Sequence, residues 1–425
     1  MRILFSYENI LPSTQADAEV FMNTAAAITR RGHPGILLTP RPPPGEEKTA
    51  RELLRFFDLD APLRIETQRA RLIHPIIQFR DHAKKLVRDP RTRSADLVYT
   101  RNLGVIRECL RRSIPVIFEH YRPWGDQFPP LQLMLRRMME NPAFLGMIAH
   151  SRFAAASYHR IGIPPEKIAV IHNGYDPKRL APRPKWEARR ALGFDRASKI
   201  VTYAGRVNHK KGLEVVLAMA RARPEISFHL VGVEKENELT KRARAIPNIQ
   251  LFPFQPFGAI ADHLFASDIL LIPPSDRPLS RHGTTILPLK LFSYLAVGRP
   301  ILAPSNGDLL ELLRDGENAS LARPMDLADI VTRLDRLFED EPFAARLARG
   351  AKQTGRSLSW DVRAAKIERF IESRLVYGGG ASSFEPFEYR RYFRESGDWL
   401  LRGLFRGEWI YRPGEDENER YAEAN

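Results

Sequence analysis

Short apolar runs alternate with amphipathic helical segments along most of the chain. The run Ile3-Leu4-Phe5 is followed by a polar loop and by a helical pattern from about Ala16 to Arg31, which Gly32 is placed to end. A second run, Ile36-Leu37-Leu38, comes next. This order predicts two parallel strands joined by a right-handed helical crossover.

The same alternation continues through two similar halves of the chain. The first half has further β-branched runs at 97–99, 116–118, 146–148 and 168–171. The second half begins again with runs at 199–203, 227–231, 249–251, 269–272 and 300–303. The Pro-, Arg- and Lys-rich stretch from Pro177 to Asp195 is interpreted as the connection. The pattern predicts an α/β fold of two Rossmann-like, doubly wound parallel sheets, with an interdomain cleft at the carboxyl ends of the strands.

Composition narrows the class of protein. At 425 residues the chain is long enough for two domains, and 43% hydrophobic with 28% charged residues is typical of a globular protein. No apolar stretch approaches the roughly 18 residues of a membrane span, and no signal-like leader is recognised. The single cysteine, Cys109, cannot form a disulfide framework. We therefore expect a cytoplasmic protein.

The net charge of +15 predicts anionic partners. These are phosphorylated small molecules, an anionic membrane surface or nucleic acid. A basic, arginine-rich proteome with solvated surface charge explains the excess equally well. Because the chain has no zinc-finger spacing, RNP-type aromatic motif or arginine-rich arm, nucleic acid is not expected.

Three segments carry candidate chemistry. In the first, Ala204 to Gly212, Gly205 permits a tight turn after a strand, Arg206 and Lys211 supply positive charge, and Gly212 is expected to open a helix whose amides favour an anion. This predicts a diphosphate-binding loop. The plain structural interpretation is a basic surface loop.

The second segment, from Gly283 to Pro300, predicts a helix capped by Thr284 or Thr285, with Pro288 in its first turn and Gly298 at its end. It provides a second helix amino terminus for the same diphosphate, or else an ordinary capped helix. The third segment is the turn His172-Asn173-Gly174, which is either a simple turn or the hinge and lip of the cleft.

Taken in order, these segments resemble the retaining glycosyltransferases of family 4, which have the two-domain GT-B fold. The matching strings include "IAHSRFAAASYHRIGIPPEKIAVIHNGYD", "VTYAGRVNHKKGLEVVL", "ASDILLIPPS", "LPLKLFSYLAVGRPILAP" and "SWDVRAAKIERFI". The resemblance implies domains at 1–177 (acceptor side) and 178–358 (nucleotide-sugar side). A helix at 359–376 then returns to the first domain, and 377–425 forms an extension.

The resemblance also implies roles for particular residues. Arg206 and Lys211 fall where the family neutralises the donor diphosphate, and His120 resembles a histidine near the transferred sugar, with Glu119 beside it as a second candidate. Acceptor contacts are expected at Glu8 and Asn9. The expected donor-binding residues are Gly205, Arg206, Lys211, Gly283, Thr284, Thr285, Ile286, Leu287 and Ser293.

The chain departs from the family where two glutamates are usual. Thr285 and Ser293 stand at those positions, so the contact that the second glutamate usually makes to the nucleotide ribose is expected to be weak or missing at Ser293. The implied activity is transfer of a sugar from a nucleotide sugar to a glycan or lipid-linked acceptor in polysaccharide biosynthesis, with retention of anomeric configuration. No metal or other cofactor is expected, since positive side chains stabilise the leaving group. Alternatives are a catalytically lapsed sugar-nucleotide-binding or scaffold protein and a sugar-nucleotide epimerase.

The last part of the chain alternates aromatic residues and arginines after Gly378-Gly379-Gly380. Trp399, Leu400, Leu404, Phe405 and Trp409 fall on apolar faces. One interpretation is peripheral attachment to the inner face of an anionic membrane, where a lipid-linked acceptor lies. The other is an extension packed on its own body or on a partner chain.

Overall fold

The computed structural model describes residues 1–69, 75–255, 259–275, 287–376, 384, 386–407 and 409–410, with the side chains of 75 and 76 excepted. The chain divides into two compact units, which we describe separately. Unit 1 comprises 1–172 and 360–425, and unit 2 comprises 173–359.

Unit 1 is built on a parallel seven-stranded sheet in the order β3-β2-β1-β4-β5-β6-β7. The strands are β1 (Ile3–Ser6), β2 (Gly35–Pro40), β3 (Arg64–Gln68), β4 (Leu97–Thr100), β5 (Val116–His120), β6 (Phe144–Ala149) and β7 (Ile168–Val170). The helices are α1 (Ala16–Arg30), α2 (Ala50–Phe56), α3 (Pro75–Leu86), α4 (Pro90–Ser94), α5 (Leu103–Leu110), α6 (Trp124–Gln127), α7 (Gln132–Glu140), α8 (Arg152–His159), α17 (Trp360–Val376) and α18 (Tyr389–Arg406), with short turns η1 (Pro129–Leu131) and η2 (Pro165–Lys167).

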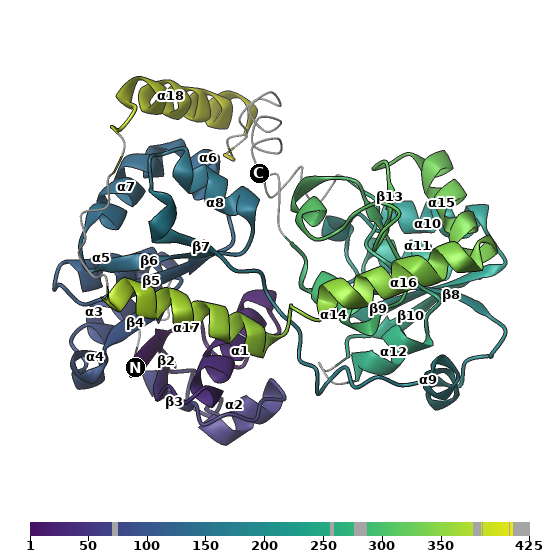
Figure 1. Ribbon diagram of the computed structural model, residues 1–425, viewed down its shortest axis with the longest axis horizontal. Coiled ribbons are helices and arrows are strands. Elements are labelled where there is room, and N and C mark those ends of the chain that lie inside the picture. The colour runs from purple at the N-terminus through teal and green to yellow at the C-terminus, as the bar shows by residue number, and fades with distance from the viewer. Residues whose placement is uncertain are drawn as a thin grey trace. The chain divides into compact units, whose positions relative to one another are not determined.

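Alternation along the strands places helices on both faces of this sheet (Figure 1). Leu4 belongs to a core formed with α3, α5, α7 and α8. Its neighbour Phe5 points the other way, where its ring meets Phe21 of α1 edge-to-face at 6.4 Å. On that face α17 packs against α1 and β6, so closely that a Cβ at Gly146 would lie 2.5 Å from the Phe370 ring.

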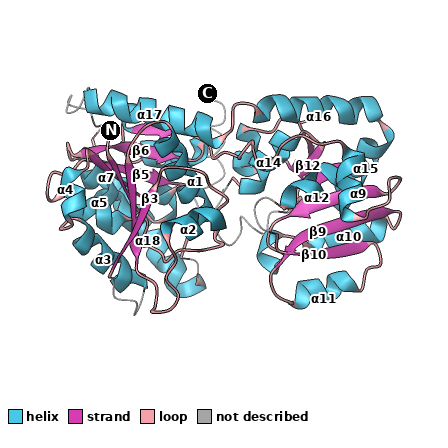
Figure 2. Cartoon of the chain, turned by 90° about the horizontal axis from the view of Figure 1, so that it is seen from below, coloured by secondary structure: helices cyan, strands magenta, loops and turns pink. Residues whose placement is uncertain are grey.

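Unit 2 repeats the design with a parallel six-stranded sheet in the order β10-β9-β8-β11-β12-β13. The strands are β8 (Lys199–Ala204), β9 (Ile226–Val233), β10 (Ile249–Pro253), β11 (Ile269–Leu271), β12 (Ile301–Pro304) and β13 (Ser320–Ala322). The helices are α9 (Lys185–Leu192), α10 (Glu214–Ala222), α11 (Glu238–Arg244), α12 (Ile260–Ala266), α14 (Leu289–Val297), α15 (Leu327–Glu339) and α16 (Glu341–Gly355), with turns η3 (His209–Lys211) and η4 (Gly307–Glu311). Figure 2 shows strands between helices in both units. The predicted pair of Rossmann-like sheets is therefore confirmed.

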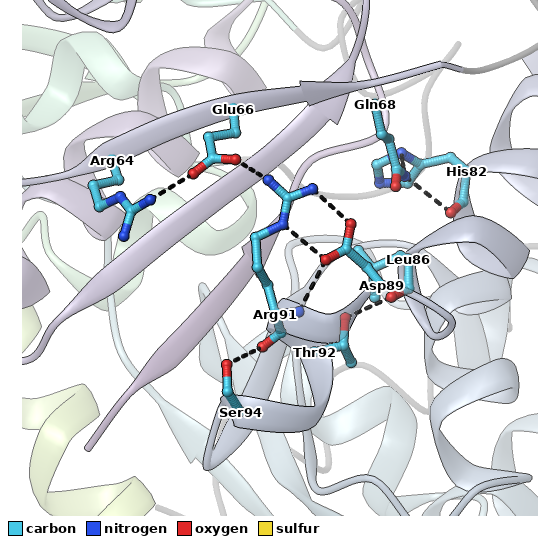
Figure 3. Close-up of polar contacts among 9 residues, drawn as sticks. All are labelled: Arg64, Glu66, Gln68, His82, Leu86, Asp89, Arg91, Thr92 and Ser94. Carbon is cyan, nitrogen blue, oxygen red and sulfur yellow. Dashed lines mark hydrogen bonds and ion pairs between the residues drawn. The ribbon is translucent and has the colours of Figure 1, made fainter.

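The edge strand β3 was not predicted from the sequence, because Arg64, Glu66 and Gln68 give it no apolar run. Polar contacts hold it instead (Figure 3). Glu66 pairs with Arg64 at 2.9 Å and with Arg91, whose backbone N–H is capped by Asp89 at 2.9 Å. Gln68 donates to the carbonyl of His82 at 3.1 Å. The strand pairs with β2 along its whole length, and these side chains connect it to α3 and α4.

Three local expectations were wrong. The segment 177–195 lies inside unit 2 and carries α9, whereas the chain passes between the units at 172–173 and 359–360. Gly212 does not open a helix: with φ 67° it ends η3, and α10 starts at Glu214. Pro288 is the N-cap of α14 rather than a first-turn residue.

Candidate functional site

In the sheet of unit 2 the strand order reverses between β8 and β11. The chain leaves β8 towards β9 and β10, then returns to the other side as β11. In open α/β sheets a ligand usually binds where the strand order reverses in this way, at the carboxyl ends of the strands. The basic loop that follows β8 begins there.

Two glycines allow this loop to lie against the end of β9. The Gly205 N–H donates to Val231 O at 2.8 Å, and the Val207 N–H donates to Gly232 O at 3.1 Å. Gly205 and Gly232 have φ values of 140° and 132°, and a Cβ on Gly232 would lie 2.2 Å from the Gly205 oxygen. Only glycine fits at these two positions without strain.

Three cations gather around this loop. Arg206 makes an ion pair with Glu234, with 3.2 Å between Nε and Oε1. Lys290, from α14, holds its Nζ 3.5 Å from the centroid of the Tyr203 ring and 2.9 Å from the place of a Cβ on Gly205. Burial, together with the charge of Lys211, lowers the pKa of Lys290 well below its usual range. Desolvation, followed by the charges of Arg206 and Lys210, also lowers the pKa of Lys211.

Within the described part of the chain, no carboxylate pairs with Lys211 or Lys290. Two neighbouring ammonium groups without a counter-charge are unfavourable unless an anion completes the site. Lys290 was not singled out from the sequence. No local motif marks it, because only the packing of α14 brings Lys290 beside a loop that lies about eighty residues earlier in the chain.

Tyr294 positions α14 at this place. Its buried hydroxyl accepts a hydrogen bond from the Ala204 N–H at 2.8 Å, at the last residue of β8. Lys290 lies one helical turn before Tyr294, on the same side of α14, and Ser293 follows Lys290 by three residues. Ser293 is half-buried, and Leu287 is buried in the core of unit 2. The expected contacts at Gly283, Thr284, Thr285 and Ile286 lie outside the described residues.

In unit 1 four adjacent strands carry polar residues at their carboxyl ends. Glu8 follows β1, Arg101 follows β4, His120 ends β5 and His150 follows β6. The strand order β1-β4-β5-β6 makes them neighbours, and the sheet also reverses between β1 and β4. Arg101 is buried, and Glu119, Asp17 and Glu8 raise its pKa against the opposing effect of burial.

The carboxylate of Glu119 is buried and hydrogen-bonded within this cluster. Its carboxylate accepts from Tyr99 Oη at 2.5 Å, from His150 Nε2 at 2.7 Å and from Arg363 Nη2 at 3.1 Å. Although burial opposes ionisation, Arg363, His150 and Arg101 hold the pKa of Glu119 well below its usual range. These contacts make it a buried structural anion.

His120 lies in an aromatic setting at the end of β5. Its ring is 3.7 Å from the Trp124 ring, measured between centroids, and its Nδ1 is 3.2 Å from the Tyr158 hydroxyl. Burial and the charge of Arg101 lower its pKa well below the usual range. At neutral pH the ring is therefore uncharged and can act only as a neutral hydrogen-bonding group.

Glu8 and Asn9 lie in the loop between β1 and α1. Burial raises the pKa of Glu8 to about 7, against the lowering effect of Arg101. Its Oε2 is buried without a hydrogen-bond partner among the described residues. The Asn9 carbonyl accepts from Thr39 Oγ1 at 2.6 Å, which fixes the loop. Glu8 thus presents an acceptor atom that a ligand hydroxyl could satisfy.

One group of potential metal ligands occurs in the described ranges. Oxygen and nitrogen atoms of His33, Glu368 and Glu372 lie within 4.8 Å of one another. Glu368 already pairs with Arg31 at 2.5 Å and with His33 at 2.6 Å. The expected absence of a metal requirement stays a prediction. Among the described residues, no helix has the length and apolarity to cross a membrane.

Comparison with known proteins gives two adjacent family matches. Residues 18–179 match Glycosyltransferase Family 4, and residues 184–354 match Glycosyl transferases group 1. The D-inositol 3-phosphate glycosyltransferase of Thermomonospora curvata is 28% identical over 241 residues, which are 51% of this chain and 53% of that protein. The enzyme of the same name from Rhodococcus erythropolis is 26% identical over 275 residues, 60% of this chain and 59% of that protein. The chain spans about half the length of these curated relatives.

Solved structures share the fold. HepE from Anabaena, in complex with UDP and glucose, superposes with a TM-score of 0.67 at 18% identity, covering 88% of this chain and 100% of HepE. Sucrose-phosphate synthase from Thermosynechococcus elongatus gives a TM-score of 0.71 at 15% identity, covering 88% and 99%. With its two parallel-sheet units and the two matched regions, the chain belongs to the family 4 type of glycosyltransferases with the GT-B fold.

Proposed function

We propose that the protein transfers a sugar from a nucleoside-diphosphate donor to a glycan or a lipid-linked saccharide, in the assembly of a cell-surface polysaccharide. The observation that carries the proposal is the pair of lysines, Lys211 and Lys290, which lie by the Gly205 loop without a carboxylate partner among the described residues, in a chain of this family. We take the nucleotide to be UDP as a working choice, because HepE was solved with UDP.

The charges support a diphosphate as ligand. A sugar-linked diphosphate carries about one negative charge on each phosphate, and cleavage of the sugar bond adds about one more on the leaving group. Arg206 is already paired with Glu234, so Lys211 and Lys290 supply the charge that remains for the ligand. Positive groups fixed in place before the reaction stabilise the departing diphosphate without reorganisation.

The proposed reaction retains the anomeric configuration and needs no metal, because side-chain cations act on the leaving group. Unit 1 supplies the acceptor side. There, Glu8 accepts a hydrogen bond from an acceptor hydroxyl, Asn9 lines the same loop, and His120 contacts the transferred sugar as a neutral ring. The protein works at the inner face of an anionic membrane when its acceptor is lipid-linked.

The test is a transfer assay with UDP- and GDP-sugars and an acceptor extract. Lys211→Ala and Lys290→Ala should each lower kcat by about a hundredfold, as expected for loss of a leaving-group contact. Lys199→Ala is the control, because Lys199 lies at the opposite end of β8. Product anomers read by NMR test retention, and activity that survives a chelator supports the metal-free mechanism. Loss of all turnover on chelation contradicts it.

A lapsed enzyme is the second candidate, favoured by Thr285 and Ser293 at the positions of the usual glutamates. It predicts tight UDP binding with no transfer from any donor. An epimerase would instead convert the donor sugar without an acceptor. Measuring binding, donor consumption and acceptor labelling on one preparation separates the three functions.

A further inference from the structure

Helix α18 lies beyond both regions that match the family models, which end at residue 354. One side of it is held on unit 1. Glu395 is buried, accepts from Gln132 Nε2 at 2.8 Å and pairs with Arg391 at 2.7 Å. Further along, a Cβ on Gly403 would lie 2.5 Å from the Trp409 ring. One side of the helix therefore packs on its own body, as one sequence interpretation expected, whereas the membrane interpretation stays a prediction.

The opposite side of α18 is exposed and apolar. Phe393, Leu404 and Phe405 keep 68%, 64% and 81% of their surface in solvent. The exposed apolar residues of the helix are Tyr389, Phe393, Leu400, Leu401, Leu404 and Phe405, which we call the outer face. Single exposed apolar residues are ordinary, but a contiguous apolar helix face marks an interaction surface.

The exposed charges that α18 itself carries on this side are positive, and the exposed Glu388 directly precedes the helix. Arg390 and Arg394 are exposed among the apolar residues, and Arg406 is exposed in the last turn of the helix. Every residue of α18 is described, and its two acidic residues are elsewhere: Glu395 is buried and Asp398 is half-buried. A pocket at the start of the helix is lined by Glu388, Tyr389, Arg390, Arg391 and Arg394. Arginines interleaved with large apolar side chains are typical of a helix that lies in the headgroup region of an anionic bilayer.

We propose that the outer face of α18 binds an anionic lipid surface, with its apolar side chains in the acyl boundary and its arginines at the phosphates. The inference identifies the membrane contact of the proposed function, and the benefit to a lipid-linked acceptor depends on that function. Vesicle binding itself requires neither a donor nor turnover.

The experiment is vesicle co-sedimentation of the full-length chain. Vesicles of phosphatidylcholine alone are compared with mixtures of phosphatidylcholine and phosphatidylglycerol. We expect binding to the anionic vesicles that weakens as salt is raised. The double variant Phe393→Ser/Leu404→Ser should lower the partition coefficient at least about tenfold on both vesicle types. Arg390→Gln/Arg394→Gln should lower it about tenfold on the anionic vesicles only.

The matched control is Leu310→Ser/Leu327→Ser, which removes two exposed leucines from unit 2 and should leave binding unchanged. The proposal is overturned if the wild-type chain ignores anionic vesicles, or if the Phe393/Leu404 variant binds as well as the wild type. It is also overturned if the wild-type chain forms a dimer that the Phe393/Leu404 variant abolishes, while neither protein binds vesicles. Binding of the chain to vesicles only after residues 411–425 are removed would overturn it as well. UDP binding, measured on the same variants, reports separately on the proposed function.

Discussion

At the scale of single residues, the most informative group is the ammonium of Lys290. A lysine held over an aromatic ring gains a cation–π contact, yet its desolvation and the nearby Lys211 disfavour the charged form. A bound diphosphate would reverse that balance. The residue therefore contributes little to the folded state alone and acts mainly when an anion is present.

Lys290→Met tests this directly. We expect the affinity for UDP to fall by about 10- to 100-fold, the size of a lost charge-assisted hydrogen bond, while weak uridine binding stays the same. Calorimetric titration of both ligands gives the two numbers. Lys199→Met is the matched control, because Lys199 also lies over a ring, 5.3 Å from the centroid of Phe338. An equal loss of uridine and UDP affinity would show a collapsed site rather than a missing phosphate contact.

Glu8 makes a prediction about pH. Its pKa in the folded protein is raised to about 7, so the folded state holds a proton that the unfolded chain releases near pH 4.5. This stability is fully present below pH 4.5 and is lost as the pH rises through 7. Relative to Glu8→Gln, the free energy of unfolding of the wild type should fall by up to about 3 kcal/mol between pH 4.5 and pH 8. Urea denaturation at both pH values measures the difference, with the exposed Glu46→Gln as control. Parallel pH profiles for wild type and Glu8→Gln would refute it.

At the scale of elements, α17 joins distant parts of unit 1 through one side chain. Arg363 is fully buried and donates to the carbonyls of Ile171 and His172 at 2.5 and 2.9 Å, as well as to Glu119. It thereby holds the end of the first chain segment of unit 1 against the helix that returns to it. A buried charge with several acceptors is costly to remove from one side only.

Arg363→Met should destabilise unit 1 by about 3–5 kcal/mol, because Glu119 is left as a buried charge without its cation. Adding Glu119→Gln should recover part of that loss. Chemical denaturation of the single and double variants provides the test, and Arg369→Met is the control, being an exposed arginine of the same helix. A cost below about 1 kcal/mol for Arg363→Met would mean that Glu119 is stabilised mainly by Tyr99 and His150.

The elements also show what the sequence could predict. Apolar runs such as those of β1, β5 and β8 identified central strands, because such strands are buried on both faces and need continuous hydrophobicity. The edge strand β3 has a neighbouring strand on one side only, and polar contacts of Arg91 and Gln68 connect it to the helices. It therefore has no continuous apolar run that would predict it from the sequence. Arg206 and Lys211 could be proposed from a local motif. Lys290, Tyr294 and Arg363 could not, because their partners are brought to them only by the packing of helices on the sheets.

At the scale of the whole molecule, chemistry is divided between two units with separate cores. The cations and glycines of the proposed diphosphate site all belong to unit 2, while Glu8, Arg101 and His120 belong to unit 1. A ligand that consists only of the nucleotide should therefore stabilise one unit. At about a hundred times its Kd, UDP contributes about 2.7 kcal/mol to the state that binds it.

Hydrogen exchange resolved by peptide should reveal where that free energy acts. With saturating UDP, amide exchange should slow by about tenfold or more in β8, in the loop from Gly205 to Lys211 and in α14, because local opening of these elements releases the ligand. Peptides that cover β4 and β5 in unit 1 serve as the internal control and should exchange at unchanged rates. The same experiment on Lys290→Met, at equal UDP concentration, should show weaker protection in unit 2. Protection confined to unit 1 would place the nucleotide beside Arg101 instead and would remove the basis for assigning the donor to the Gly205 loop.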